Sequence, residues 1–517
     1  MYDVIIIGAG IGGVTTAALL AHSGYRVLLL EGHLEPGGCI SSFRRKRPDG
    51  SEYIFDVGAT LFGGFQPGGA HDWVARRLGI RFPVVQLEPA MQIWLPDRVI
   101  TRTGDPHGWQ VERQTAFPEQ AAQAERFWQH QERLADISWR FAAQHPPMPP
   151  ETPGDLLRLI PTLRPELLGL LPHLPRTVGN ELRRCGLTDR ALRTFIDAQL
   201  LISAQVTADE CAWPFGSVAL DLARQGVFYV EGGAWTIART LADACIRDGG
   251  EVRYRTWVTR ILLEHGRAAG VQTQTGEVYH ARHVIANLTL WDVQRLLDTA
   301  TPPALERVTR TIPDAWGAFM LYLGVDAAAI PSDLCAHHQI VCDYAVPLGE
   351  GNSVFLSLHP AFDTSRAPAG RRALTISTHT RPEQWWAARS AGRAVYNERK
   401  EQLAGQMLAA VERVLPDIRR HIRYQQSGTP VTFQRYTRRE RGMVGGLGQR
   451  PAQSGFAGLG TRAAHVPGLW LVGDSIFPGQ SSAAVIQSGI HVWRTVRGEL
   501  RFDAARLRKG TAKVPQK

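Results

Sequence analysis

The stretch that decides the fold is the N-terminal segment Tyr2–Ile40, which reads YDVIIIGAGIGGVTTAALLAHSGYRVLLLEGHLEPGGCI. It opens with an apolar run typical of a buried strand, breaks into glycines and continues with the apolar spacing of a helix. Gly8, Gly10 and Gly13 lie in the break, and Glu31 ends a second apolar run. This order of strand, glycine turn, helix, strand and acid predicts a dinucleotide-binding βαβ unit.

Each residue type has a physical reason to stand where it does. Gly8 permits the tight turn out of the strand, Gly10 leaves room for a pyrophosphate, and Gly13 lets the helix pack closely on the sheet. The unpaired N–H groups and the dipole of the helix N-terminus stabilise an anion. Glu31 can accept hydrogen bonds from an adenosine ribose and would repel a 2′-phosphate, which disfavours NADP. The alternative is a glycine turn that binds no nucleotide.

A second glycine pair, Gly37-Gly38, follows shortly after the acid. It resembles the extended FAD motif of the amine oxidase and carotenoid desaturase superfamily, in which this loop adds backbone N–H groups to the pyrophosphate. Cys39 stands where many members carry arginine. The pyrophosphate charge would then meet the backbone or the basic run Arg44–Arg47, for which a solvated loop is an equal alternative.

Composition bounds the remaining possibilities. At 517 residues and 44% apolar, the chain can bury a large core and should form two domains. The net charge of +10 could indicate nucleic acid, but no nucleic-acid motif is present and the arginines are scattered, so no nucleic-acid partner is expected. An anionic membrane surface fits the basic charge better.

The six cysteines show no disulfide spacing. Cys335, His337, His338 and Cys342 lie close together, but no second ligand pair accompanies them, so we expect no metal. Asp3 stands where a secretory signal would be basic, and no apolar run is long enough to span a bilayer. These features predict a cytoplasmic protein that is peripheral to a membrane.

Two later segments complete the predicted cofactor domain. Gly232-Gly233, a helix and a strand that begins at Val258 resemble the second FAD segment of the same superfamily, in which the backbone at the Val258 position meets the adenine. Glu231 replaces the usual proline there, which is a departure.

Near the C-terminus, a strand ends in Gly473-Asp474 and a helix follows. Asp474 is placed to bind the ribityl chain and pyrophosphate. The helix N-terminus near Ala484 and Val485 would point its dipole at the flavin N1/O2 edge. The alternative is a buried strand and helix with an incidental acid.

The predicted fold class is α/β with an α+β second domain, in which a Rossmann-like FAD-binding domain is interleaved with a substrate domain of mixed sheet and helices. Residues 1–87, 215–290 and 425–505 would form the FAD-binding domain, residues 88–214 and 291–424 the substrate and membrane-associating domain, and residues 506–517 a basic tail.

Within the substrate domain, Met91–Leu95 and Gln110–Glu112 alternate as strands do, and residues 121–142 have helical periodicity. The leucine-rich, proline-punctuated stretch Leu156–Pro172 could be core, a surface that dips into a bilayer or the mouth of an apolar tunnel; core is favoured. Trp385-Trp386 could face substrate, but packing is the commoner role of such pairs.

The whole chain resembles the carotenoid desaturase and isomerase family of FAD enzymes, and within it the 3,4-desaturases of cyanobacterial type. The segments that carry this resemblance are Phe55–Thr60, Phe127-Trp128, Ser138–Phe141, Gly428–Thr432 and Gly473–Gln480.

The resemblance implies hydride transfer from an allylic C–H of a long polyene to flavin N5, with oxygen or a quinone as the electron acceptor and a dry apolar tunnel for the carotenoid. It identifies no catalytic base; Glu231 and Arg441 are candidates with structural alternatives. A carotene cis-trans isomerase would share every FAD motif. An amine oxidase would need an aromatic cage and a lysine beside the flavin. A lipid carrier on the same fold is a further alternative, which reduction of bound flavin by a lipid would exclude.

Overall fold

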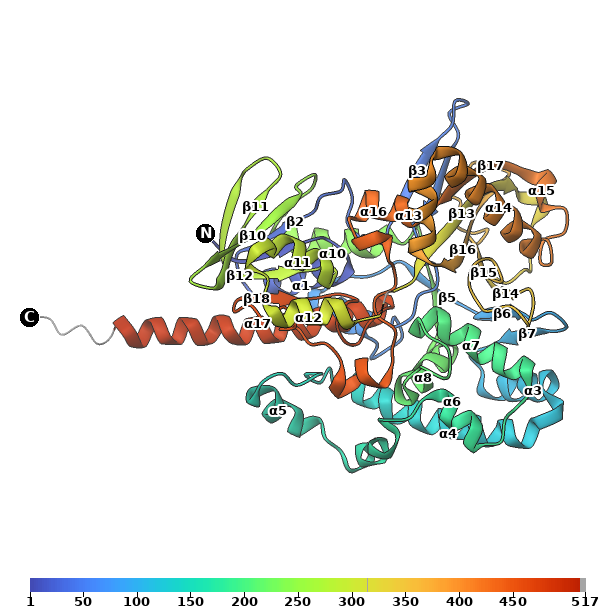
Figure 1. Cartoon of the computed structure of the whole chain (residues 1–517), viewed down its shortest axis with the longest axis horizontal. Coiled ribbons are helices and arrows are strands. Elements are labelled where there is room, and N and C mark those ends of the chain that lie inside the picture. Colours follow the sequence, from blue (N-terminus) through green and yellow to red (C-terminus); the bar gives the residue numbers. More distant parts are fainter. Residues whose placement is uncertain (314, 512–517) are drawn as a thin grey trace, which may run out of the picture.

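The computed structural model describes residues 1–313 and 315–511 of the 517. Two sheets and a separate group of helices make up the molecule, and the chain passes among them several times (Figure 1). The predicted mixed α/β class with two interleaved sheet regions is confirmed. Of the predicted basic tail, residues 506–511 continue the last helix and residues 512–517 lie outside the described residues.

The first sheet has seven strands in the order β10-β11-β12-β1-β2-β9, with β18 paired to β12. Val4 of β1 lies opposite Val27 of β2, and Ile6 lies opposite Ile285 of β12, all in parallel register. Strands buried on both faces need apolar side chains at consecutive positions, which is why the first apolar run of the sequence became β1. The strands are β1 (Tyr2–Ile7), β2 (Val27–Leu30), β9 (Glu251–Arg253), β10 (Val258–Glu264), β11 (Arg267–Thr273), β12 (Val278–Ala286) and β18 (Leu469–Leu471).

Helices cover both faces of this sheet. One face packs on α1 (Ile11–His22), α2 (Ala70–Leu78), α10 (Trp235–Arg247) and the long α17 (Ser482–Thr511). The other face packs on α11 (Leu290–Leu297) and α12 (Pro303–Thr311), through Val293 and Leu305 among others. The predicted range 291–424 would place α11 and α12 in the substrate domain, whereas their apolar sides are buried on the first sheet.

The second sheet also has seven strands, in the order β17-β13-β16-β15-β14-β6-β7. All its pairs are antiparallel except β14 with β6. The predicted start of the last FAD segment, residue 425, falls inside β17. The strands are β6 (Met91–Trp94), β7 (Val99–Arg102), β13 (Gly317–Asp326), β14 (His337–Val341), β15 (Ser353–Leu358), β16 (Arg371–Thr380) and β17 (Ile422–Gly428).

Three helices pack against this second sheet: α13 (Pro382–Ala391), α14 (Arg393–Val411) and α15 (Ile418–His421). Trp385 is fully buried and stacks on Phe319 with ring centroids 5.2 Å apart, so packing is its role. Two short ladders stand apart from both sheets, and a short helix follows β17. These are β3 (Ser42–Lys46) with β4 (Glu52–Asp56), β5 (Val84–Leu87) with β8 (Val227–Val230), and α16 (Pro430–Thr437).

The helical group lies below both sheets in Figure 1. The expected strand at Gln110–Glu112 is wrong, since these residues lie in α3, whose start is fixed by Pro106 and by the Asp105 side chain, which accepts the Gly108 N–H at 2.6 Å. Phe127, Trp128 and Phe195 form the aromatic centre of this group. Its helices are α3 (Pro106–Ala116), α4 (Ala121–Ala142), α5 (Pro153–Leu159), α6 (Val178–Arg184), α7 (Arg190–Ala204), α8 (Trp213–Leu220) and α9 (Leu222–Gln225).

The leucine-rich stretch is exposed, and the expectation that it is mainly core is wrong. It forms α5 and two 3-10 segments, η2 (Ile160–Thr162) and η3 (Pro165–His173). Leu157 and Leu168 are 68% and 67% exposed. Prolines keep these turns short, so although η3 contacts α4 and α8, none of its leucines is fully buried.

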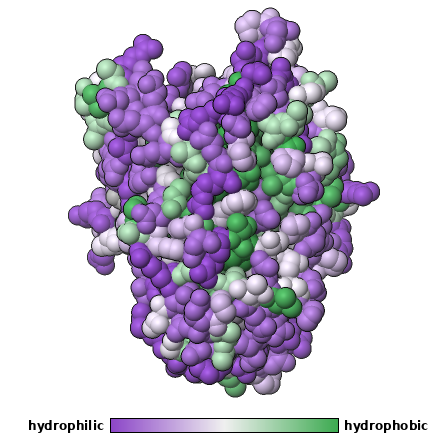
Figure 2. All heavy atoms as spheres, turned by 90° about the vertical axis from the view of Figure 1, so that its right-hand side faces the viewer, coloured by the Kyte–Doolittle hydropathy of each residue, from purple (hydrophilic) through white to green (hydrophobic). Residues whose placement is uncertain are grey.

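A second apolar region lies on the face of the molecule seen in Figure 2. Figure 2, which looks onto the right-hand side of Figure 1, shows hydrophobic residues gathered in a furrow across the middle of that face. The furrow lies between the second sheet above and the helical group below. The helices and this sheet share one core on this side of the molecule, since Ile93 of β6, Ile100 of β7 and Val341 of β14 belong to the same buried cluster as Trp128.

Candidate functional site

A cavity of about 1020 Å³ lies where the carboxyl ends of the first sheet's parallel strands meet the second sheet. Nine of the eleven predicted cofactor residues line it: Gly8, Gly10, Glu31, Gly37, Gly38, Val258, Gly473, Asp474 and Val485. Ligands of open α/β sheets bind at this edge. The cavity is therefore the candidate cofactor site.

The first glycine turn forms one wall. Gly8 has φ +91°, which a side chain would strain, and Gly10 precedes α1 without any side-chain cap on the helix. A Cβ on Gly13, which does not line the cavity, would collide with the carbonyl oxygen of Gly8. The first turn of α1 thus presents uncapped N–H groups to the cavity, and Gly13 keeps the helix close enough to do so.

Glu31 stands at the end of β2, where the sequence places the ribose acid. Its carboxylate accepts the N–H of Ala9 at 2.7 Å and the N–H of His33 at 2.8 Å. Burial raises the pKa of Glu31, and the hydrogen bonds from His33 and Ala9 oppose that rise. The carboxylate is held by the turn itself, with its remaining acceptor capacity open to a ligand.

The second glycine pair packs directly on the first turn. The Gly37 N–H donates to the Ala9 carbonyl at 2.8 Å, and Gly10 and Gly37 form an isolated parallel bridge. Gly37 and Gly38 have φ of +116° and +60°. Both positions therefore need the left-handed conformations that glycine adopts freely, and they bring a second stretch of backbone to the same place.

Asp474 lines the same cavity and is held by an arginine that the sequence did not single out. Arg439 donates from both terminal nitrogens to the Asp474 carboxylate, at 3.1 and 3.0 Å, and from Nε to the Met443 carbonyl at 2.7 Å. Burial lowers the pKa of Arg439, but Asp474 more than offsets this and raises it above the ordinary value. This ion pair fixes the Asp474 carboxylate in the cavity wall and has no net charge.

The start of α17 reaches the cavity through Val485. Ala484 does not line it; its N–H donates to Ser481 Oγ at 3.1 Å. Gly473 N–H donates to Ser488 Oγ at 3.0 Å, which ties the strand end to the helix. Of the two residues expected at this helix terminus, only Val485 faces the cavity.

Five arginines line the cavity, namely Arg44, Arg45, Arg295, Arg438 and Arg439. Two of them belong to the basic run Arg44–Arg47, so half of that run faces the cavity. Arg45 Nε donates to Gln426 at 2.7 Å, and Arg438 lies over the Trp257 ring at 4.8 Å. Cys39 also lines the cavity, and burial raises the pKa of its thiol, so it carries no charge there.

Three further residues shape the site and were missed from the sequence. Asn287 follows β12, and its side chain fills the space beside Gly10 and Gly12. A Cβ on Gly446 would collide with the Asp474 carbonyl oxygen. The adjacent glycines Gly445 and Gly446 are a sequence signal that could have pointed to this close approach. Trp257 packs on Gly32 beside Val258, where the adenine is expected.

The site meets the demands of FAD. Its glycines leave close approach to backbone N–H groups, its arginines supply positive charge for a pyrophosphate, and Glu31 supplies the acceptor for a ribose. Both sheets contribute to the cavity. Its lining includes Trp257, next to β10 of the first sheet, and Tyr322 of β13 in the second sheet. Neither Glu231 nor Arg441 lines it, so neither is placed to act as a base there.

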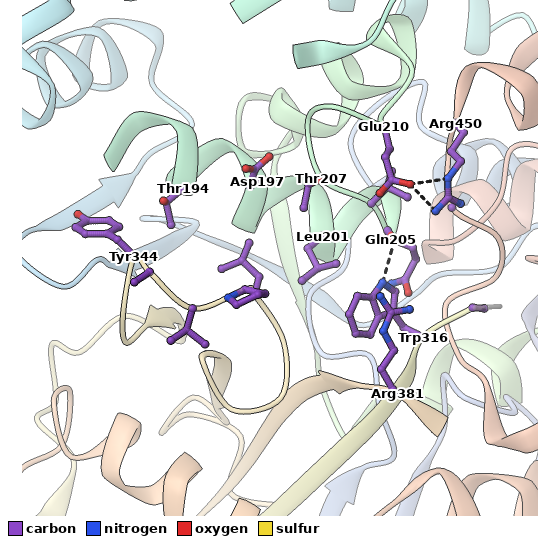
Figure 3. Close-up of a pocket in the computed structure, with 17 residues that line it drawn as sticks. Thr194, Asp197, Leu201, Gln205, Thr207, Glu210, Trp316, Tyr344, Arg381 and Arg450 are labelled. Carbon is purple, nitrogen blue, oxygen red and sulfur yellow. Dashed lines mark hydrogen bonds and ion pairs between the residues drawn. The ribbon is translucent and has the colours of Figure 1, made fainter. Parts of the chain in front are cut away.

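A smaller cavity of about 470 Å³ lies between α7 and the second sheet (Figure 3). The Gln205 side chain donates to Gln480 at 2.8 Å, and the Trp316 ring N–H donates to the Gln205 carbonyl at 3.1 Å. Arg450 pairs with Glu210 at 2.8 Å. This cavity borders the turn that leads into α17, but its lining mixes charged and apolar residues and is not the purely apolar tunnel expected.

The side chains around Cys335 are engaged in hydrogen bonds to backbone carbonyls. The Cys335 thiol hydrogen-bonds to the Pro89 and His337 carbonyls, and His338 donates from Nε2 to the Cys335 carbonyl at 2.7 Å. Among the described residues, only His130, Glu181 and Cys185 bring three potential ligand atoms within 4.8 Å of one another.

Comparisons with known proteins show the family of the chain. The sequence profile of the family described as flavin containing amine oxidoreductase matches residues 11–492. Prolycopene isomerase 2 of an Oncidium hybrid cultivar is 31% identical over 97% of this chain and 85% of its own length. A 4,4′-diapophytoene desaturase from Methylomonas sp is 26% identical over 94% of this chain and 93% of its own.

Among solved structures, an oxidoreductase from Methanosarcina mazei superposes with a TM-score of 0.63 at 16% identity, covering 95% of this chain and 100% of that one. At that identity the likeness shows the fold. The family profile and the isomerase relative each cover nearly the whole chain, and the chain therefore belongs to the flavin-containing amine oxidoreductases, in their carotenoid desaturase and isomerase branch, as an FAD-dependent oxidoreductase-type enzyme.

Proposed function

We propose that this protein is an FAD-dependent carotene cis-trans isomerase that acts on an acyclic poly-cis carotene. The observation that carries the proposal is the 31% identity to a prolycopene isomerase over 97% of the chain, against 26% to a carotenoid desaturase. The resemblance had favoured a 3,4-desaturase, and the FAD motifs are the same for both. The higher overall identity supports the isomerase.

The residues of the chain would hold the cofactor as follows. The α1 N-terminus and the Gly37-Gly38 backbone would meet the pyrophosphate, and Glu31 the adenosine ribose. Asp474, fixed by Arg439, would meet the ribityl chain. When bound, FAD supplies reversible electron transfer to and from the polyene.

The start of α17 has a distinct electrostatic role in the proposal. A helix N-terminus carries about half a positive charge, which favours negative charge within the first turn. Val485 brings this terminus to the cavity wall, opposite the second sheet. The chain would thereby stabilise the reduced form of a flavin whose pyrimidine edge lies there.

A membrane surface is the proposed source of the substrate, since a long polyene dissolves in lipid. The exposed leucines of α5, η2 and η3 support a peripheral association. No helix among the described residues is both long and apolar enough to cross a bilayer. Isomerisation consumes no electrons overall, so oxygen or a quinone would be needed only if a desaturation occurred.

The test uses the purified protein, loaded with FAD, and a poly-cis acyclic carotene in liposomes. The flavin is reduced chemically under anaerobic conditions in one arm and left oxidised in the other, and products are separated by chromatography and weighed by mass spectrometry. We expect a product of unchanged mass and lower cis content in the reduced arm. A product two hydrogens lighter would refute the isomerase and support the desaturase.

A matched variant ties the reaction to the site. Gly13→Ala should abolish both FAD retention and conversion, because its Cβ would collide with the Gly8 carbonyl. Gly405→Ala, in α14, is the control, since a Cβ there meets nothing within 4 Å. Conversion by the FAD-free Gly13→Ala protein would contradict the proposed role of the cavity.

A further inference from the structure

A third cavity, of about 360 Å³, lies in the helical group, behind the exposed leucines. Its lining is strongly basic: three arginines, Arg133, Arg176 and Arg184, and two histidines, His130 and His173. The remaining lining residues are Leu134, Ile137, Gly169 and Trp213. No carboxylate is part of the lining, so the cavity favours an anion.

One buried carboxylate lies next to this cavity and neutralises part of the positive charge of its lining. Glu181 has a fully buried side chain and accepts from Arg184 Nη2 at 2.6 Å. It also lies 2.7 Å from His130 Nδ1. Glu181 is therefore fully engaged with Arg184 and His130, and it leaves Arg133 and Arg176 uncompensated.

Both of those arginines are available. Within residues 1–313 and 315–511, the Arg176 guanidinium has no hydrogen bond or ion pair, and Arg133 makes only a bond from Nε to the Gln129 carbonyl, at 3.2 Å. His173 Nδ1 is buried without a partner. An arginine fork and an unpartnered imidazole facing one cavity suit phosphate oxygens.

A metal ion fits this cluster poorly. The three potential ligands His130, Glu181 and Cys185 are close enough together, but Arg184 already donates to Glu181 from two nitrogens. Burial raises the pKa of the Cys185 thiol, and Glu181 raises it further. A cation would also have to sit beside an arginine that it would repel.

The position of the cavity indicates which anion. The segment η3 contributes Gly169 and His173 to the cavity, while its Leu168 and Leu171 are 67% and 54% exposed. A phosphate in the cavity would therefore lie directly behind apolar side chains that can enter an acyl layer. This is the arrangement that one amphiphile, with a charged head and an apolar tail, would fill.

We propose that this cavity binds the phosphate of an anionic phospholipid while the leucines of η3 enter the bilayer, so that one site docks the enzyme on the membrane. The inference rests on the membrane association in the proposed function and gives it a location and a lipid class. The cavity takes no part in holding FAD, since its lining shares no residue with the cofactor cavity.

The test measures co-sedimentation of the FAD-loaded protein with phosphatidylcholine vesicles, with and without phosphatidylglycerol. We expect binding to depend on phosphatidylglycerol. Arg133→Gln/Arg176→Gln should weaken it by roughly fivefold for each arginine removed. Leu168→Ser/Leu171→Ser should also weaken binding to the vesicles that contain phosphatidylglycerol. Retained flavin absorbance shows that each variant is folded.

The matched control is Arg260→Gln/Arg393→Gln, which removes the same charge from two exposed positions on β10 and α14. Equal weakening by the control and the cavity variant would overturn the proposal, because net charge alone would then explain binding. Unchanged binding of the cavity variant, or no binding of the wild type to anionic vesicles, would also overturn it.

Inorganic phosphate, compared with chloride at equal ionic strength, separates a lipid headgroup from a free anion. Thermal stabilisation by phosphate without vesicle binding would overturn the lipid assignment in favour of a free anion. Carotene conversion in detergent separates this inference from the proposed function. Loss of vesicle binding in the cavity variant with wild-type conversion supports the docking site, whereas absent conversion with cavity-dependent docking refutes only the isomerase.

Discussion

Replacing Arg366 by methionine should destabilise the protein more than any surface substitution, because it leaves a buried charge without its partner. Arg366 and Asp56 have side chains 1% and 5% exposed, and Arg366 Nη2 lies 2.9 Å from Asp56 Oδ1. The carboxylate also accepts from Ser42 Oγ at 2.7 Å and from the Ala234 N–H at 2.9 Å. Those two neutral donors would remain in the variant.

The magnitude follows from this geometry. Removing one partner of a buried ion pair costs about 3–5 kcal/mol, since the other charge stays desolvated. The two neutral hydrogen bonds that remain place Arg366→Met near the lower end, at about 3 kcal/mol. In Asp56→Asn/Arg366→Met neither charge is left, so the double variant should lose less than the two single variants added together.

The dependence of stability on pH should distinguish this ion pair from apolar packing. Burial raises the pKa of Asp56, but Arg366 and His359 more than offset the rise and hold it below the ordinary value. Its stabilisation is thus complete above the unfolded pKa, near 4, and is lost as the pH falls below that value. In Arg366→Met, His359 Nε2, which is 3.6 Å from Asp56, should take up a proton more readily and shrink the deficit at mildly acidic pH.

Urea unfolding followed by tryptophan fluorescence measures the free energy of unfolding of each variant. With a denaturant slope of about 3 kcal/mol/M, Arg366→Met should lower the midpoint by roughly 1 M. Arg260→Met, at an exposed position, is the control and should stay within about 0.5 kcal/mol of the wild type. A loss below about 1 kcal/mol for Arg366→Met, or strict additivity in the double variant, would refute the reasoning.

Three further predictions concern the cofactor and pH. Arg439→Gln should weaken FAD binding by roughly tenfold or more, since it removes two charged hydrogen bonds to Asp474. Arg439→Lys should restore only part of the affinity. Wild-type FAD affinity in titrations of the Gln variant would contradict this role of Arg439. Asn287→Leu should reduce FAD affinity, because its amide lies against Gly10 and Gly12, while the free energy of unfolding stays within about 1 kcal/mol of the wild type. Unchanged retention of FAD on gel filtration would count against it. Burial lowers the pKa of His337 to about 3 and the pKa of His338 and of His379 to about 4. Below pH ~6.5 the unfolded chain therefore binds more protons than the folded one, and the free energy of unfolding should fall by up to ~1.4 kcal/mol per pH unit for each histidine down to pH ~4. A flat stability profile between these two pH values in urea titrations would disprove it.

The sequence by itself determined the cofactor half of the site. Strand, turn and helix in residues 2–40 are set locally: consecutive apolar residues form a buried parallel strand, and glycine adopts the positive φ of Gly8 and Gly37 without strain. Glu31 directly follows β2 and Asp474 comes three residues after β18, and parallel strands end at one edge of a sheet, which is why both were found. These features depend on neighbours in sequence, so a single chain suffices to read them.

Tertiary structure alone decided which distant side chains complete the walls and which apolar segments stay outside. Arg439 and Asn287 reach the cavity from separate segments, and no spacing rule links them to Asp474 or Gly10. The leucines of η3 have the composition of a core but lie on the surface, and behind them the fold gathers Arg133 from α4 with Arg176 and His173. Whether an apolar residue is buried depends on whether other elements pack against it. A sequence pattern shows that the residue is apolar, but not which distant elements lie beside it.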